Sequence, residues 1–477
     1  MTAPPEGLIV IAKRDCPTCS MIEPVLRQLG SGPLPLTVYS QDDPAFAAGA
    51  GSVIHDETLE HSWRLGTEIV PTLLRVENGR EVERTYGWHR PDWERLSGQA
   101  PLGAELPESR PGCGSKTLDP GIPERLRARF AGEALSARRI EPGTNEDPME
   151  ACFERGWTDG LPVVPPTPER VLRMLAGTQQ PPDAVIGRIP PNLAPCTVEK
   201  VAINAVMAGC RPEYLPVVLA AVKAALREEF SLHGLVCTTM FGSPLIIVNG
   251  PVARDIGMNS GGNALGQGNR ANATIGRALQ LIIRNVGGGR PGEIDRAALG
   301  NPGKYTFCFA EAEDTGWEPL SVQQGHSREA STVTLFPGEG VQGVVDQKSR
   351  TPESLARSFA NSLGAVQNTK IAGVGGAVLV VAPEHRRVFR AAGWSKDRLL
   401  RELDALLLMP GDALAAGAGG VAEGLRPGAT GRSVSKFRPG GLLIVHAGGD
   451  TGLFSAIIPG WPGGHLGANP VTEEIHP

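Results

Sequence analysis

The chain has no apolar run long enough to cross a bilayer. A spanning helix needs about 20 apolar residues, whereas the longest candidate, Leu215 to Leu226, is shorter and contains Lys223. The first residues also lack a basic stretch followed by an apolar one, so we expect no secretory signal. The sequence therefore predicts a cytoplasmic protein that has no membrane partner.

An excess of positive charge is missing as well. The 46 Lys and Arg residues are outnumbered by 51 Asp and Glu residues, which gives a net charge of −5. Nucleic-acid binding is not expected, because it needs a concentrated basic surface. Hydrophobic residues make up 41% of the 477 residues, enough for sizeable cores, and this length predicts two to four domains.

The two sequence patterns most typical of zinc sites, paired CxxC motifs and HExxH, are absent. Eight cysteines are present, and a chain without a secretory signal keeps them reduced. Cys152, Cys196 and Cys210 lie beside apolar periodic positions and are expected to be buried fillers. A zinc or copper site is a further hypothesis, and its candidate ligands are His233, Cys237 and Cys308.

The first hundred residues alternate between strand-like and helical patterns. Cys16-Pro17-Thr18-Cys19 follows an apolar run, and Asn78-Gly79 is a strong hairpin signal. The predicted order is β-α-β-α-β-β-α, with strands at Gly7–Ala12, Leu34–Tyr39, Thr72–Val76 and Glu81–Thr85, and helices after Cys19, around Asp56–Leu65 and at Arg90–Leu96.

This order, with CxxC opening the first helix and Val70-Pro71-Thr72 before the hairpin, resembles the thioredoxin/glutaredoxin fold over about Gly7 to Gly98. The unpaired N–H groups of a helix N-terminus favour the thiolate of the leading cysteine. The resemblance implies that Cys16 attacks a disulfide, that Cys19 resolves the mixed disulfide, and that Pro71 is a cis-proline facing them. The alternative is half of a zinc site or an inert pair.

The sequence departs from the thioredoxin pattern at Asp15, which stands where thioredoxins usually carry Trp. The Asp15 carboxylate would raise the pKa of Cys16, whereas Lys13 and Arg14 would lower it. The sequence alone leaves this balance open.

A further thiol, Cys113, lies between glycines in Gly112-Cys113-Gly114-Ser115, where an open backbone suits a reactive cysteine. Together with Pro383-Glu384-His385, Gly393-Trp394-Ser395-Lys396 and a late glycine-rich strand end, this segment resembles the UGSC-type family, in which a selenocysteine or cysteine opens a U-G-S-C motif. Lys116 replaces the final Cys of that motif, so Cys19 could supply the resolving thiol. An incidental linker cysteine is the alternative.

Asparagine and glycine are concentrated between Gly257 and Asn272, before a helix expected to start near Ala273 with Asn272 as its N-cap. Free N–H groups at such a start bind anions, and an arginine can add a charge-assisted contact. The segment matches no nucleotide-binding motif, and a long structural turn is the alternative. The candidate substrate-binding residues here are Asn259, Asn263, Asn269, Arg270 and Asn272.

A similar arrangement follows the predicted strand Leu442–His446, whose glycine-rich loop leads to a helix expected to start within Leu453–Ile458. Ligands gather at such strand ends in open α/β sheets. His446 or Asp450 could therefore bind substrate or act as acid or base, although a core histidine is the more common outcome. Trp157 and Asp159 could line a pocket or belong to a rigid entry into the large domain.

The fold class predicted for the chain is α/β, with a thioredoxin-like domain followed by a larger α/β unit of one or two domains. The expected parts are a thioredoxin-like domain (1–98), a connector that carries Cys113 (99–145), an α/β domain with the Asn/Gly-rich loop (146–331) and an α/β domain with the glycine-rich strand end (332–477).

The leading functional hypothesis is a thiol–disulfide oxidoreductase in which the CxxC domain supplies electrons to Cys113. Cys113 would act on a small anionic or thiol-containing molecule bound by the large unit, and a cellular thiol would be the reductant. One alternative is a metal-dependent lyase or transferase regulated by the CxxC domain, and another is a non-enzymatic redox sensor. The sequence leaves a homo-oligomer open.

Overall fold

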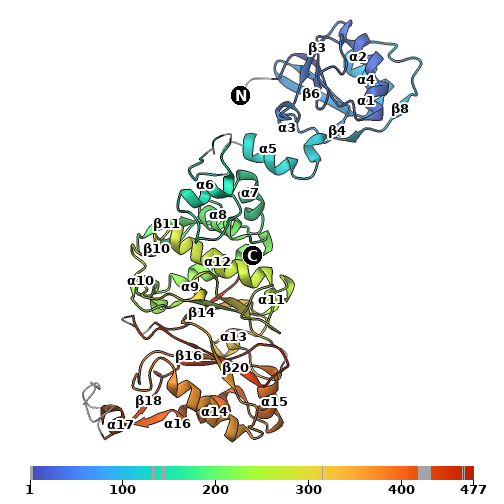
Figure 1. Ribbon diagram of the computed structural model, residues 1–477. Helices are drawn as coiled ribbons and strands as arrows, with labels where there is room; N and C mark the ends of the chain where they lie inside the picture. Colours follow the sequence, from blue (N-terminus) through green and yellow to red (C-terminus); the bar gives the residue numbers. More distant parts are fainter. Residues whose placement is uncertain are drawn as a thin grey trace. The chain divides into compact units, whose positions relative to one another are not determined.

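The computed structural model describes residues 4–130, 135–140, 143, 145–313, 315–416, 431–464, 466 and 468–476. The chain forms two compact units, Met1–Ala134 and Leu135–Pro477, and both mix helices with sheets (Figure 1). The α/β fold class is thereby confirmed. None of the helices in the described ranges is long and apolar enough to traverse a bilayer.

The first unit is built on one five-stranded sheet of order β3-β2-β1-β5-β6. The first three strands are parallel, and β5 runs antiparallel to β1 and forms a hairpin with β6. Asn78 and Gly79 turn this hairpin with φ angles of 53° and 69°, the left-handed values that such a turn requires. The strands are β1 (Gly7–Ala12), β2 (Leu36–Ser40), β3 (Ser52–His55), β5 (Thr72–Glu77) and β6 (Arg80–Tyr86).

Four helices accompany this sheet, and the six residues of β1 are buried on both faces. Apolar residues of α2, α4 and the central strands form one core with Cys16 and Cys19. The buried sheet centre therefore fixes the position of the CxxC segment. The helices are α1 (Pro17–Met21), α2 (Glu23–Gly30), α3 (Glu60–Arg64) and α4 (Arg90–Ser97).

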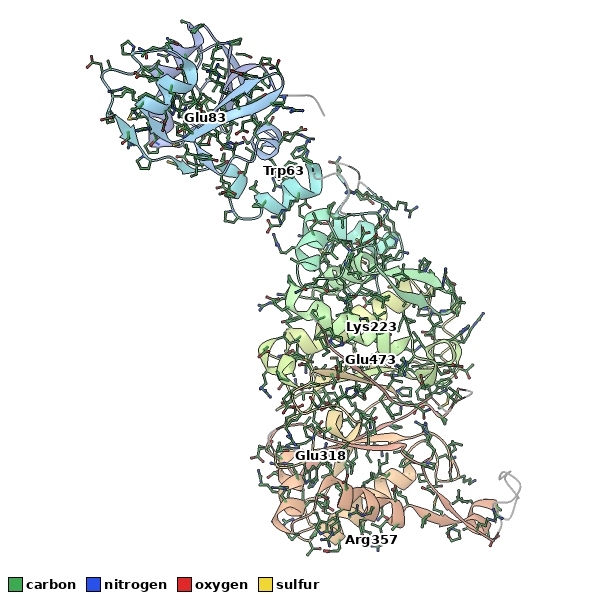
Figure 2. The ribbon with its side chains drawn as sticks, turned by 180° about the vertical axis from the view of Figure 1, so that it is seen from behind. Trp63, Glu83, Lys223, Glu318, Arg357 and Glu473 are labelled. Carbon is green, nitrogen blue, oxygen red and sulfur yellow. The ribbon has the colours of Figure 1, made fainter. Side chains whose placement is uncertain are left out.

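The first unit continues beyond α4, through much of the segment expected to be a connector. The two-residue strand β4 (Ile69–Val70) pairs with β9 (Cys113–Gly114), and β7 (Trp88–His89) pairs with β8 (Ser109–Arg110). Helix α5 (Ile122–Phe130) also belongs to this unit, since Phe130 packs on Trp63 of α3 with 6.0 Å between ring centroids (Figure 2). Residues 99–130 are therefore part of the first unit, which contains the CxxC motif and is also called the CxxC unit below.

The second unit has four layers, which Figure 1 shows as helices, a sheet, a second sheet and further helices. One sheet has the order β13-β12-β14-β21 and the other has the order β15-β20-β16-β19. Their strands are β12 (Ser243–Asn249), β13 (Cys308–Ala310), β14 (Thr332–Gly338), β21 (Val471–Glu474), β15 (Gln342–Val345), β16 (Ala377–Val381), β19 (Leu442–His446) and β20 (Phe454–Pro459).

Three apolar clusters join these layers. The first sheet packs on one group of helices, the two sheets pack on each other through Leu245, Phe336 and Val378, and the second sheet packs on another group of helices. The first group includes α7 (Pro168–Leu175), α8 (Val198–Ala208), α9 (Leu215–Ala225), α10 (Leu232–Cys237) and α12 (Arg270–Asn285). The second is α14 (Pro352–Ala365), α15 (Pro383–Ala391) and α16 (Lys396–Leu406).

Shorter elements complete the second unit at its surface and between its main segments. They are α6 (Pro148–Glu154), β10 (Val185–Ile189), β11 (Ala194–Thr197), α11 (Pro251–Asp255), α13 (Leu320–Gln323), β17 (Leu408–Pro410), α17 (Gly411–Ala416) and β18 (Ser433–Ser435).

Two features of this unit differ from the sequence prediction. The boundary expected near Ser331 falls inside the first sheet, because β14 from the C-terminal part pairs with β12 and β21 pairs with β14. The helix expected to start within Leu453–Ile458 is instead strand β20, which pairs with β16 and β15. A short apolar run does not distinguish a strand from a helix, and here sheet pairing decides.

Phe359 provides a test of the helical layer over the second sheet. It is fully buried and packs on Phe389 and His385. Phe359→Ala is expected to lower the free energy of unfolding by about 3–5 kcal/mol, measured by denaturant unfolding of the full chain. The matched control is Phe153→Ala, because Phe153 is 56% exposed, and it should change that free energy by about 0.5 kcal/mol or less.

Candidate functional site

Three cysteine sulfurs meet in the first unit. Cys16 precedes α1, and its sulfur accepts a hydrogen bond from the Cys19 N–H at 3.4 Å. The Cys16 sulfur also lies 3.6 Å from the Val70 carbonyl oxygen, and the Val70–Pro71 peptide bond is cis. Cys113 is paired with Val70 in the β4–β9 ladder, and its side chain is hydrogen-bonded to Cys16.

Local contacts hold Cys113 in this position. The Cβ of any other residue at 112 would come within 2.7 Å of the Val70 carbonyl oxygen, so only glycine lets the two strands approach. The Thr18 hydroxyl donates to the Pro111 carbonyl at 2.7 Å. Gln41 donates to the Ser115 hydroxyl at 2.8 Å. Cys113 is thus fixed beside the CxxC pair, whereas the sequence suggested a mobile linker.

Hydrogen bonds make Cys16 the most acidic of the three thiols. The pKa of Cys16 is lowered to about 5, chiefly by its hydrogen bond to the Cys19 side chain and also by that to Cys113, against the effect of burial. Burial raises the pKa of Cys19 far above its usual value, and the hydrogen bond to Cys16 raises that of Cys113. At neutral pH the centre therefore holds one thiolate and two thiols.

The charges next to the CxxC motif do not control this order. Arg14 forms an ion pair with Asp43. Lys13 acts on Cys113, where it opposes the upward shift of the pKa. The pKa of Cys16 is therefore lowered by hydrogen bonds to the other two thiols and to backbone amides. The balance of Asp15, Lys13 and Arg14, which the sequence left open, does not decide it.

The three sulfurs differ in their access to solvent. Cys16 and Cys19 are fully buried, while Cys113 is partly exposed. A dissolved molecule therefore reaches Cys113 before it reaches Cys16. This difference separates the most acidic thiol from the most accessible one.

In the second unit, the two predicted binding loops lie next to each other. The Gly448 N–H donates to the Ser260 carbonyl at 2.9 Å, which joins the loop after β19 to the Asn/Gly-rich loop before α12. Asp450 is at the surface in an ion pair with Arg387. Arg270 donates to the Gly209 carbonyl at 2.9 Å.

The asparagine side chains in this region hold the loop itself. The Asn259 N–H donates to the Asn272 side-chain oxygen, and the Asn272 side-chain amide donates to the Asn259 carbonyl. Asn263 donates to the Gln267 carbonyl at 2.7 Å. Asn269 donates to the Gly257 carbonyl and accepts from the Asn272 N–H. The N-cap of α12 is therefore Asn269, and the prediction of Asn272 is wrong, because the first helical turn begins at Arg270.

A buried ion pair lies next to these loops, and the sequence analysis did not predict this pairing. Lys396 and Glu311 are each 2% exposed and 2.5 Å apart. Glu311 also accepts from the Asn249 amide at 2.8 Å and from the His446 N–H at 3.3 Å. Asn249 and Glu311 are polar residues at the ends of buried strands, and this pattern in the sequence could have marked them as candidate site residues.

Both histidines of the predicted motifs are inside the second unit. Burial lowers the pKa of His446, whose Nδ1 lies 2.6 Å from the Val381 carbonyl oxygen. His385 is held by the Ser455 hydroxyl at 2.8 Å and by the Asp346 carbonyl at 3.0 Å. His446 is thus a buried, neutral histidine at a strand end.

The candidate metal ligands are not assembled into a site. In the described ranges, no group of three or more His, Cys, Asp or Glu side chains is placed to hold a metal ion. His233 and Cys237 lie on α10, while Cys308 lies on β13 in the apolar core near Cys210. Cys152, Cys196 and Cys210 are buried in the same core.

Comparison of the chain with protein-family models, with curated proteins and with solved structures gives no match.

The order of the thiol pKa values can be measured directly. We expect the ultraviolet absorbance of thiolate to rise with a midpoint near pH 5, where the pKa of Cys16 lies, and this step should be missing in Cys16→Ser. Cys113→Ala removes a donor to the thiolate and should raise the midpoint by about one pH unit. Cys113→Ser keeps a hydroxyl donor and serves as its control. An unchanged midpoint in Cys113→Ala would show that Cys113 does not stabilise the thiolate.

Proposed function

We propose that the first unit is a thioredoxin-like thiol–disulfide oxidoreductase centre in which Cys113 is the thiol that meets the substrate. The observation that carries this proposal is the placement of a partly exposed thiol in hydrogen-bond contact with a buried thiolate of pKa about 5. The parallel β1–β2–β3 arrangement, the CxxC before α1 and the cis peptide at Pro71 support the thioredoxin-like assignment.

The substrate is a small molecule with a disulfide bond or a comparably electrophilic sulfur. The Cys113 thiolate attacks one substrate sulfur, and the other substrate sulfur leaves as a thiol that takes its proton from Cys16, which leaves Cys16 as a thiolate. The Cys16 thiolate then attacks the Cys113 sulfur, which forms a Cys16–Cys113 disulfide and releases the second half of the substrate. Cys19 attacks Cys16 and frees Cys113, so two electrons pass to the substrate and a Cys16–Cys19 disulfide remains.

The proton shared by Cys16 and Cys113 starts this sequence. When it moves to Cys16, the Cys16 thiol can donate to the Val70 carbonyl at 3.6 Å, and Cys113 becomes the thiolate. Formation of the disulfide then removes the negative charge of Cys16, one of the causes that raise the pKa of Cys19. Each step thus prepares the next thiol for attack.

A cellular thiol would reduce the Cys16–Cys19 disulfide after each turnover, in keeping with a reducing compartment.

Trapping the intermediate tests this order of events. Cys19→Ser treated with 2-hydroxyethyl disulfide should form a Cys16–Cys113 disulfide, seen by mass spectrometry as a loss of two hydrogens without an adduct. The wild-type protein should instead accumulate the Cys16–Cys19 disulfide. Cys196→Ser is the matched control, because Cys196 is buried in the other unit.

The double variant Cys19→Ser, Cys113→Ser decides between Cys113 and Cys16 as the attacking thiol. Burial of Cys16 should leave this variant almost unreactive towards the probe. A 2-hydroxyethyl adduct on Cys16, formed at the rate seen for Cys19→Ser, would show that the substrate reaches Cys16 directly and would overturn the role given to Cys113.

A further inference from the structure

Two adjoining cavities in the second unit lie beside the C-terminal half of α12. The first has a volume of about 510 Å³ and the second about 480 Å³, and they share Asp159, Arg284 and Pro291. Each is within the size range of small-molecule sites. Both cavities therefore lie at the opposite end of α12 from its N-terminus, where the Asn/Gly-rich loop lies.

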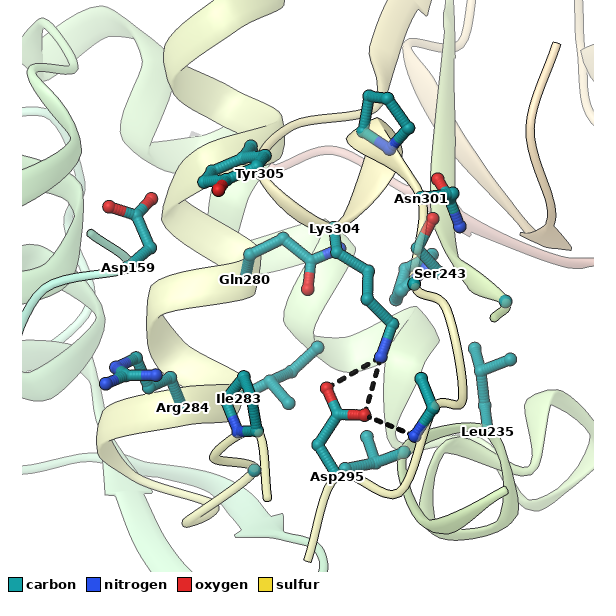
Figure 3. Close-up of a pocket in the computed structure, with 18 of the residues that line it drawn as sticks. Asp159, Leu235, Ser243, Gln280, Ile283, Arg284, Asp295, Asn301, Lys304 and Tyr305 are labelled. Carbon is teal, nitrogen blue, oxygen red and sulfur yellow. Dashed lines mark hydrogen bonds and ion pairs between the residues drawn. The ribbon is translucent and has the colours of Figure 1, made fainter. Parts of the chain in front are cut away.

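The charged side chains in and around these cavities differ in their ion pairs. Figure 3 shows Lys304 bound to Asp295 in the first cavity, with 2.6 Å between nitrogen and oxygen. Asp159 is bound by Arg277, which donates to both carboxylate oxygens at 2.7 and 2.8 Å. The carboxylates of Asp295 and Asp159 are therefore each paired with a cation other than Arg284.

Among the residues that the structure describes, neither Arg284 nor Arg290 has such an ion pair. Each buries its Nε–H without a hydrogen-bond partner in the part of the chain that the structure describes. Arg284 lines both cavities and Arg290 lines the second. The exposed Glu293 also lines the second cavity, yet it forms no ion pair with either guanidinium among the described residues.

The two guanidinium groups also repel each other. Burial and the charge of Arg290 lower the pKa of Arg284, and the charges of Asp159 and Glu293 only partly offset this effect. Both arginine side chains are half-buried, and burying part of a charged group without a partner costs free energy that an anionic ligand would offset. An anion with several oxygens could accept from both planar donors at once.

The rest of the first cavity is partly apolar. Leu235, Val236 and Ile283 line it, with Ser243 and Gln280 as polar neighbours. In Figure 3, Arg284 and Asp159 lie at one side of this space, and Leu235 lies at the opposite side. A ligand that fills it would thus have a charged end and an apolar end.

We propose that the two cavities together bind a small organic anion, with its phosphate or carboxylate group at Arg284 and Arg290 and its apolar body against Leu235, Val236 and Ile283 of the first cavity. The site is independent of the thiol chemistry proposed for the first unit. The glycines and proline around Arg290, in the run Gly287-Gly288-Gly289-Arg290-Pro291-Gly292, let the backbone turn so that the arginine faces the cavity wall.

Calorimetric titration of the full chain with phenyl phosphate tests this proposal. We expect saturable binding that weakens about tenfold or more in Arg284→Gln and in Arg290→Gln, since each substitution removes charge-assisted hydrogen bonds. Arg296→Gln is the matched control, because Arg296 lies in the same segment, is exposed and does not line either cavity. Phenol, which lacks the charge, should bind about tenfold or more weakly than phenyl phosphate.

Thermal unfolding without ligand separates lost binding from lost folding. Removing one of two repelling cations should leave the unfolding temperature of Arg284→Gln and Arg290→Gln equal to or above that of the wild type. The proposal is overturned if phenyl phosphate binds both variants as tightly as the wild type, or if phenol binds as tightly as phenyl phosphate. Disulfide trapping at Cys113 should be the same in these variants, which keeps the two proposals distinguishable.

Discussion

The acidity of Cys16 in the first unit depends on its contacts with two neighbouring thiols, those of Cys19 and Cys113. The Cys16–Cys113 hydrogen bond exists only because β9 lies against β4, and that pairing requires glycine at position 112. The same contact covers Cys16 and leaves Cys113 at the surface. A CxxC motif alone would expose its acidic thiolate to any oxidant. Here acidity and accessibility belong to different residues.

In the second unit, the corresponding constraint is the buried pair of Lys396 and Glu311. Glu311 follows β13 in the first sheet, Lys396 opens α16 on the far side of the second sheet, and the His446 N–H comes from the end of β19. Buried charges are tolerated only when their remaining hydrogen-bonding capacity is filled, and the Asn249 amide and the Leu320 N–H complete that set. These bonds join both sheets at one end, where the glycine-rich loops meet.

Local patterns in the sequence were enough to predict some elements, since β1 and β19 have the predicted bounds. Apolar periodicity and capping residues are local, and they determine where such elements begin and end. The sequence suggested that Cys113 works with the CxxC pair, but its fixed position depends on the pairing of β4 with β9, which are far apart along the chain. Strand β20 was taken for a helix for the same reason. Arg284 and Arg290 become candidate ligand-binding residues only when the structure shows that their buried Nε–H groups lack hydrogen-bond partners among the described residues.

The strand order of the second unit has a consequence for biosynthesis. The first sheet contains β12, from Ser243–Asn249, and is completed by β21, from Val471–Glu474. During synthesis from the N-terminus, β14 keeps an open edge until the ribosome has released the residues of β21. The CxxC unit needs none of those residues and can acquire its three-sulfur centre early. Between the synthesis of β14 and that of β21, the nascent chain therefore carries a complete first unit and an unpaired strand edge on β14.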